Sequence, residues 1–285
     1  MLYATRFMKL IDGKKLAEAI RREVKEQIET QGLRPGLAVI LVGDDPASHL
    51  YVGLKERSCR EVGIRFEKFI FPAGVPEETV IETIEAVNGR SDIHGILVQL
   101  PLPEGLDENR VVRAIDPRKD VDGFHPENLR LLRTGNPRLV PGVARGIVAL
   151  IEATGVPLAG KTAALLVNSA TFAEPIVALL RARGADSTVI LAKEVAEKTT
   201  EMKNADILIV AIGQPKFIRG EMIKKGAVII DIGTTRVGDR TVGDVDAESV
   251  ATRAGWLSPV PGGVGPMTVA MLLKNVLEAT KLPKK

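Results

Sequence analysis

The chain has 285 residues, more than one hydrophobic core usually supports, and its 45% hydrophobic and 26% charged content is that of a folded protein rather than a disordered one. Its 39 basic and 36 acidic residues leave a net charge of only +3, which does not indicate a nucleic-acid-binding surface. The single cysteine excludes an internal disulfide, and no apolar run approaches the roughly 18 residues that cross a membrane, so we expect a cytoplasmic protein.

The first half of the chain alternates between helical and strand patterns. Asp12 is placed to cap a helix whose apolar residues recur every four positions, at Leu16, Ile20, Val24 and Ile28. Short apolar runs at 37–42, 66–71 and 95–99 predict strands, and the patterns at 46–62 and 76–88 predict helices between them. Three βα units therefore account for about the first 115 residues.

The second half repeats this alternation with its own set of elements. Helical patterns occur at 147–154, 175–184 and 194–204, and strand patterns at 163–167, 187–191, 206–212 and 227–232. A final apolar helix is predicted at 267–280. A stretch rich in Pro, Gly, Asp and Arg between residues 116 and 142 separates the two sets and indicates a domain boundary.

This order predicts an α/β fold of two domains, an N-terminal three-layer α/β domain and a Rossmann-type nucleotide-binding domain, with a cleft between them. We expect residues 8–122 and 267–285 to form the first domain, and residues 145–266 to form the second.

Polar residues gather at three places in the predicted first domain. Ser48, Tyr51 and Lys55 are spaced three and four apart, so they share one face of the second helix. Gln99 ends a strand in the segment GILVQLPLP, where parallel sheets bind ligands. Asp122 lies beside a glycine in the tight loop DVDGFHP. Each feature alone is also compatible with a solvated helix face or a structural loop.

Taken together with LVGDDPASHLY at 41–51 and PVPGGVGPMTVA at 259–270, the segments GILVQLPLP and DVDGFHP resemble the methylenetetrahydrofolate dehydrogenase/methenyltetrahydrofolate cyclohydrolase family. The resemblance runs from about Met8 to the end of the chain. It implies oxidation of 5,10-methylenetetrahydrofolate with NADP, followed by hydrolysis of the methenyl product to 10-formyltetrahydrofolate. It also implies a homodimer, with tetrahydrofolate derivatives as substrates and no nucleic-acid or membrane partner.

The resemblance also assigns roles in a folate site. It implies that Lys55 is the catalytic lysine, that Tyr51 stacks on the pterin, that Gln99 supports the lysine and that Asp122 anchors the folate. Among the cationic side chains, lysine is the one whose pKa falls most readily on burial. A lowered pKa suits proton transfer near neutral pH. Ser48, Pro261, Gly262 and Gly263 are expected to bind substrate.

The predicted cofactor site departs from the family pattern at its phosphate-binding turn, VNSATFAEP at 167–175. Val167 and Ala173 replace two glycines, and Glu174 replaces a basic residue, changes that predict weakened NADP binding or a preference for NAD. The residues expected to hold the cofactor are Ser169, Lys193, Gly213, Gly233 and Thr234.

One different class of function fits the same features. A non-catalytic subunit that binds folate or a protein partner would be compatible with an altered cofactor turn. The three histidines lack the spacing of a ligand set, so we expect no metal, and Cys59 is expected to be a small buried apolar group. Residues 1–7 precede the resemblance and are expected to be an extension or an early start.

Overall fold

The computed structural model describes residues 8–283. The expected extension at residues 1–7 lies outside these residues. The described chain forms two compact units: Glu18–Gly142 with residues 269–283, and residues 8–17 with Val143–Thr268. We call them the three-stranded unit and the six-stranded unit, after their sheets. Helix α1 (Gly13–Thr30) and helix α10 (Val264–Ala279) each run from one unit into the other, so residues 8–17 belong to the six-stranded unit.

The three-stranded unit is built around one buried strand. Strand β2 (Gly36–Val42) lies between β3 (Arg65–Phe71) and β4 (Gly95–Val98), and both pairings are parallel. Every residue of β2 is buried, as expected for a continuous apolar run in a parallel sheet.

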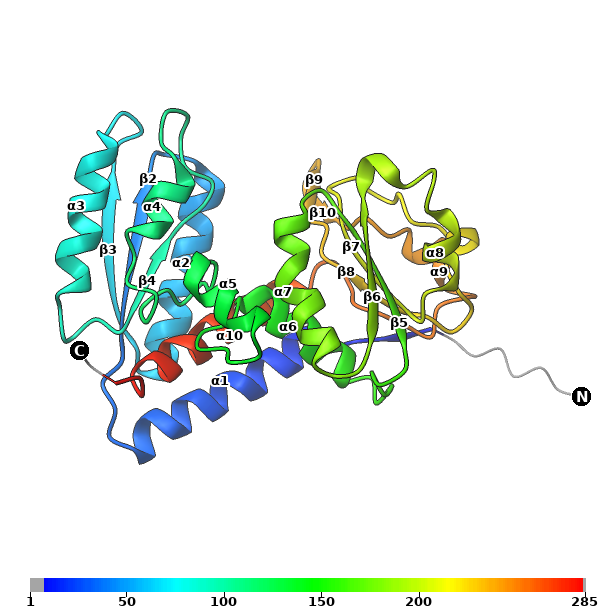
Figure 1. Ribbon diagram of the computed structural model, residues 1–285, viewed down its shortest axis with the longest axis horizontal. Helices are drawn as coiled ribbons and strands as arrows, with labels where there is room; N and C mark the ends of the chain where they lie inside the picture. The colour runs from blue at the N-terminus through cyan, green and yellow to red at the C-terminus, as the bar shows by residue number, and fades with distance from the viewer. Residues whose placement is uncertain (1–7, 284–285) are drawn as a thin grey trace, which may run out of the picture. The chain divides into compact units, whose positions relative to one another are not determined.

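Alternate residues of this sheet face two helical layers. Leu37, Val39 and Leu41 pack with residues of α1, α2 (Pro46–Val62) and α10. Ala38, Ile40 and Val42 pack with residues of α3 (Glu77–Asn88) and α4 (Glu108–Arg113). Figure 1 shows α3 alongside this sheet, next to β3. The predicted three-layer α/β organisation is confirmed.

Side-chain caps fix where the helices of this half begin. The Asp12 carboxylate accepts from the backbone N–H of Lys15, as predicted for the start of α1. Asp45 accepts from the N–H of Ser48 at 2.8 Å and Pro46 is the first residue of α2, which places Tyr51 and Lys55 on its second and third turns. Gly63, with φ of 84°, ends α2 in the left-handed conformation.

The six-stranded unit holds one parallel sheet in the order β1-β11-β8-β7-β5-β6. The strands are β1 (Lys9–Leu10), β5 (Thr162–Val167), β6 (Asp186–Leu191), β7 (Ile207–Ala211), β8 (Val228–Asp231) and β11 (Trp256–Leu257). Buried residues of β5, β7 and β8 pack with Met202 of α8 (Thr199–Asn204) and Val250 of α9 (Ala247–Val250). Helix α7 (Ala170–Arg181) packs on β5 and β6. The sheet is that of a nucleotide-binding domain.

The remaining elements are short connections or helices that flank the sheets. Helix α5 (Pro126–Arg133) belongs to the three-stranded unit, and α6 (Gly142–Glu152) begins at the end of that unit and continues in the other. In the six-stranded unit, β9 (Thr235–Val237) and β10 (Arg240–Val242) form an antiparallel pair. Among residues 8–283, no helix combines the length and apolar character needed to span a bilayer.

Several predicted helices have different bounds. Helix α6 begins at Gly142 rather than at residue 147, and α10 begins at Val264 rather than at residue 267. Helix α7 begins at Ala170 rather than at Pro175, because the Ser169 hydroxyl accepts from the N–H of Phe172 and caps it one turn earlier. The helix expected at 194–204 is instead a 3-10 turn (Ala192–Glu194) followed by α8, since the Glu194 carboxylate bonds back to the N–H of Leu191 and closes a tight turn.

Candidate active site

Lys55 and Gln99 meet at the carboxyl end of the three-stranded sheet. The Lys55 Nζ donates a hydrogen bond to Gln99 Oε1 at 2.7 Å. Gln99 is held in turn, because its backbone N–H donates to Ile40 and its side-chain Nε2 donates to the carbonyl of Leu100 at 2.7 Å. With Nε2 engaged by a carbonyl, the carboxamide presents its oxygen to the ammonium.

Asp122 is the second titratable side chain of this site, within electrostatic range of Lys55. Burial lowers the pKa of Lys55, and the charge of Asp122 opposes that change. Burial also raises the pKa of Asp122 to about 6, with a further increase from the charge of Asp120, while Lys55 acts in the opposite direction. Both groups therefore move toward the pH range in which enzymes transfer protons.

The loop that carries Asp122 is fixed against β4. The N–H of Ile96 donates to the carbonyl of Lys119 at 2.7 Å, so the loop lies alongside β4, the strand that leads into Gln99. Gly95 makes this possible, because a Cβ there would lie 2.6 Å from Val121. Gly123, at φ of 84°, turns the chain where a Cβ would lie 2.5 Å from the backbone nitrogen of Pro141.

Buried polar residues that the sequence reading did not single out support this loop. Asp120, 1% exposed, accepts from the N–H groups of Gly123 and His125 and from Asn128 Nδ2. Asn275, on α10, donates to the carbonyls of Val121 and Val140, both at 2.8 Å. The sequence signal for Asn275 is a lone amide in a mostly apolar helix.

The other predicted residues of α2 differ in exposure. Tyr51 is 48% exposed, whereas Ser48 is 5% exposed at the capped start of the helix. Three other large apolar residues are also exposed: Leu50 and Leu54 on α2, and Leu100 after β4. Exposed apolar side chains of this kind can pack against a ligand ring. Cys59 is fully buried, and burial raises its pKa to about 12, so it remains a thiol.

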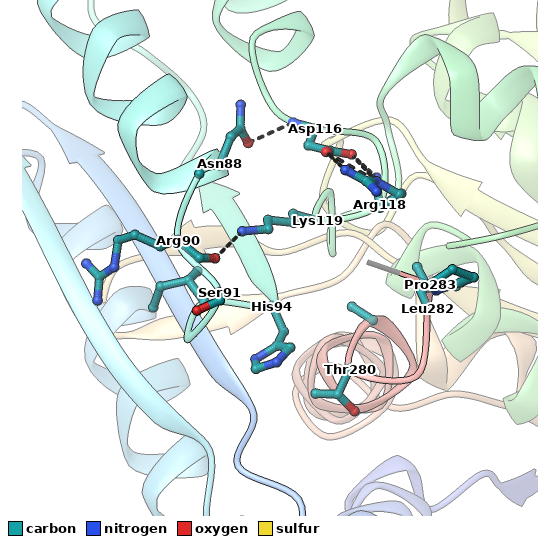
Figure 2. Close-up of a pocket in the computed structure, with 13 residues that line it drawn as sticks. Asn88, Arg90, Ser91, His94, Asp116, Arg118, Lys119, Thr280, Leu282 and Pro283 are labelled. Atoms are coloured by element: carbon teal, nitrogen blue, oxygen red, sulfur yellow. Dashed lines mark hydrogen bonds and ion pairs between the residues drawn. The ribbon is translucent and has the colours of Figure 1, made fainter. Parts of the chain in front are cut away.

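A separate cavity of about 490 Å³ lies at the opposite end of β4, between the residues after α3, the turn at 116–119 and the end of α10. Figure 2 shows two of its cationic side chains engaged: Arg118 pairs with Asp116, and Lys119 donates to the carbonyl of Arg90. The cavity is not lined by Lys55, Gln99 or Asp122.

Residues expected to bind the cofactor lie at the carboxyl ends of strands in the six-stranded unit. Ser169 and Thr234 are exposed after β5 and β8, and Lys193 is exposed after β6. Gly213 follows β7 with φ of 68°, and no heavy atom lies within 4 Å of the position a Cβ would occupy. This open backbone, beside the N-terminal N–H groups of the 12-residue helix α7, fits a dinucleotide phosphate.

Gly233 and the 261–263 segment have close protein neighbours instead. A Cβ on Gly233 would lie 2.5 Å from Asp244 Cγ, so this glycine makes room for a carboxylate. Gly262 and Gly263 are buried and Pro261 is exposed. A Cβ on Gly13 would lie 2.1 Å from the carbonyl oxygen of Gly263, so this segment packs tightly against the start of α1.

Comparison with known protein families covers both parts of the chain. Residues 11–122 match the catalytic domain of tetrahydrofolate dehydrogenase/cyclohydrolase, and residues 141–284 match its NAD(P)-binding domain. The chain belongs to this family. The bifunctional protein FolD of Moorella thermoacetica is 47% identical over 276 residues, which are 95% of this chain and 98% of the relative.

Solved structures of family members have the same fold. The FolD methylenetetrahydrofolate dehydrogenase/cyclohydrolase of Campylobacter jejuni superposes with a TM-score of 0.92 at 37% identity, covering 96% of this chain and 99% of the other. The enzyme of Trypanosoma brucei, solved with NADP and an inhibitor, has a TM-score of 0.91 at 37% identity and covers 96% and 98%. Nothing in these comparisons favours a non-catalytic subunit.

The comparisons give no support to the predicted weakening of NADP binding, and the geometry of the turn removes the steric basis of that prediction. Val167 and Ala173 are both 0% exposed, so their side chains fill the interior rather than the ligand edge. Oε1 of Glu174 is also buried. The exposed part of the turn, residues 168–171, carries the Ser169 hydroxyl and the helix N-terminus. Among residues 8–283, no three His, Cys, Asp or Glu side chains are grouped as a metal site.

Proposed function

We propose that this family member is a bifunctional enzyme that oxidises 5,10-methylenetetrahydrofolate with NADP and hydrolyses 5,10-methenyltetrahydrofolate to 10-formyltetrahydrofolate. The observation that carries the proposal is the 2.7 Å hydrogen bond from Lys55 to Gln99, in a site whose charge balance includes Asp122. Family membership supports both activities.

Lys55 is the proton-transfer group in this proposal. Hydrolysis forms a C–O bond from water to the methenyl carbon and breaks the bond from that carbon to a ring nitrogen. The ring nitrogen takes one proton, and the second proton of water is released. A lysine of lowered pKa can accept the proton of the attacking water and pass it to the ring nitrogen, whereas an ordinary lysine stays charged at neutral pH.

Gln99 and Asp122 orient the reactants. The Gln99 oxygen can accept a hydrogen bond from the ammonium or from the neutral amine of Lys55, because both forms carry N–H groups. It therefore orients the side chain without fixing its charge. Asp122, when ionised, can accept two hydrogen bonds from the amino-pyrimidine edge of a pterin. Tyr51, nearly half exposed, offers its ring for stacking on the same ligand.

NADP, when bound, supplies the acceptor for the hydride that leaves the methylene carbon. The residues that would hold it are Ser169 and the first N–H groups of α7, together with the open backbone at Gly213. Lys193 is the exposed cation after β6 that suits a 2′-phosphate, which supports NADP over NAD.

Two assays on the purified full-length chain test this proposal. Loss of the near-ultraviolet absorbance of methenyltetrahydrofolate reports hydrolysis, and formation of NADPH from methylenetetrahydrofolate reports oxidation. We expect both activities, with NADP used better than NAD. A protein that binds folate but turns over neither substrate would overturn the proposal. A homodimer, implied by the family, is tested by light scattering.

A further inference from the structure

Two buried carboxylates lie in the six-stranded unit, at the strand ends that bind ligands in sheets of this kind. Asp231 is the last residue of β8 and is 3% exposed, and Asp244, two residues after β10, is 0% exposed. Carboxylates are rarely this buried unless the structure or the chemistry uses them.

Hydrogen bonds from backbone N–H groups to these carboxylates join the exit loops of two neighbouring strands. Asp244 Oδ2 accepts from the backbone N–H groups of Ile212 at 2.7 Å and Gly213 at 3.0 Å, directly after β7. Asp231 accepts from the N–H groups of Gly233 at 2.9 Å and of Asp244 itself at 3.0 Å. One connected network therefore runs from the exit of β7, through Asp244, to the exit of β8.

The surrounding sequence makes room for this network at a cost in stability. A Cβ on Gly243 would lie 2.0 Å from Asp231 Oδ2, and one on Gly233 would lie 2.5 Å from Asp244 Cγ. Two like charges are held close together away from water, and burial with the Asp244 charge raises the pKa of Asp231 to about 6. An apolar pair would avoid this penalty, so the carboxylates are better explained by what they hold in place.

The fold of the segment does not depend on the Asp244 side chain alone. The backbone carbonyl of Asp244 accepts from the N–H of Ile218, and the carbonyl of Gly243 accepts from the N–H of Lys216. These bonds keep residues 243–245 docked beside residues 216–218. The side chain adds a different contact, to the two N–H groups that shape the Gly213 loop.

We propose that Asp244 is a positioning residue for the dehydrogenase reaction, which holds the Gly213 loop in the conformation that binds the dinucleotide. This inference rests on the proposed function. It assigns Asp244 an effect on one of the two activities, because the Lys55, Gln99 and Asp122 side chains belong to the other compact unit.

The test compares Asp244→Ala with Asp244→Asn in the full-length chain. The alanine variant loses the acceptor, and we expect at least a tenfold increase in the KM and in the directly titrated Kd for NADP, with kcat changed less than threefold. The asparagine variant keeps an acceptor oxygen, and we expect its KM for NADP to stay within threefold. Methenyl hydrolysis should stay within twofold in both.

Asp246→Ala is the matched control. Asp246 lies two residues on and caps α9 through the N–H of Ser249, so its loss should leave NADP binding unchanged. An unaltered KM for NADP in Asp244→Ala, or equal losses of both activities in a folded variant, would overturn the inference. If the alanine variant does not fold, the asparagine variant decides, since a tenfold loss of NADP affinity there contradicts a role based on the acceptor. A wild-type chain with no NADP-dependent oxidation would instead refute the proposed function.

Discussion

The Lys55 ammonium lies 2.7 Å from the carboxamide oxygen of Gln99, a neutral partner that leaves the pKa of the lysine depressed by its burial. A charged partner at the same position would have the opposite effect. Replacement of Gln99 by Glu therefore tests why the partner is neutral.

We expect Gln99→Glu to raise the pKa of Lys55 by about one unit or more, because an anion within hydrogen-bonding distance stabilises the ammonium. Methenyl hydrolysis should fall at neutral pH and recover at higher pH. The measurement is kcat/KM against pH for wild type and variant, with Gln99→Met as the uncharged control. An acidic limb, on which the rate rises with pH, that does not move to higher pH in Gln99→Glu would contradict the assigned role of Lys55 as a base.

We expect Asp122 to make the KM for methenyltetrahydrofolate depend on pH. Because its folded pKa is raised to about 6, Asp122 takes up a proton as the pH falls through 6, and it then loses the charge proposed to hold the pterin. The KM for methenyltetrahydrofolate should rise up to tenfold per pH unit below about 6. In Asp122→Asn the KM should be high and independent of pH in this range, while the exposed control Asp44→Asn should follow wild type. A wild-type KM that is flat from pH 7 to pH 5 would be incompatible with this role.

Asn275 connects the stability of the fold to the Asp122 loop. Asn275→Leu keeps the size of the side chain but removes both donors to the carbonyls of Val121 and Val140. We expect the free energy of unfolding to fall by about 2–4 kcal/mol, since two buried acceptors lose their partner, together with a higher KM for folate. Urea titration measures the first quantity. Lys274→Met, next to it on α10, removes an ion pair to Glu23 that is partly exposed to solvent and should cost under about 1 kcal/mol. Equal losses of unfolding free energy in the two variants would show that the two hydrogen bonds of Asn275 contribute no more than the partly exposed ion pair.

The variant Val167→Gly tests whether the buried side chain of Val167, in the altered phosphate turn, affects NADP binding. Because it is a fully buried residue at the end of β5, Val167→Gly should lower the free energy of unfolding by about 2–4 kcal/mol. It should not strengthen NADP binding, since no side-chain atom at this position faces solvent. Thermal unfolding and isothermal titration check the two statements. A Val167→Gly variant that binds NADP several-fold more tightly than wild type would show that this side chain does keep the phosphate away.

Much of the fold could be predicted because local patterns and burial agree. Helix α2 was predicted with its observed bounds, since Pro46 and Gly63 mark its two ends in sequence. The pairing of Lys55 with Gln99 was implied by the family resemblance of their two segments, and the structure places them in hydrogen-bonding contact.

The rest depended on contacts between distant residues. Val167 and Ala173 looked unfavourable in sequence, but only the packed structure shows that their side chains point into the core. The link from Asp244 to Gly213 joins residues 31 apart, and no local pattern indicates it. Asn275 lies 154 residues from Val121, so its support of the Asp122 loop was equally beyond a reading of motifs.

The most direct test of the account is the rate of methenyl hydrolysis by Lys55→Met, a variant of similar length without the amine. Loss of a general acid–base group predicts a decrease in kcat of about 100-fold to 10,000-fold, with an unchanged melting temperature and retained folate binding. Hydrolysis at the wild-type rate by a correctly folded Lys55→Met protein would contradict the central claim that this amine transfers the proton.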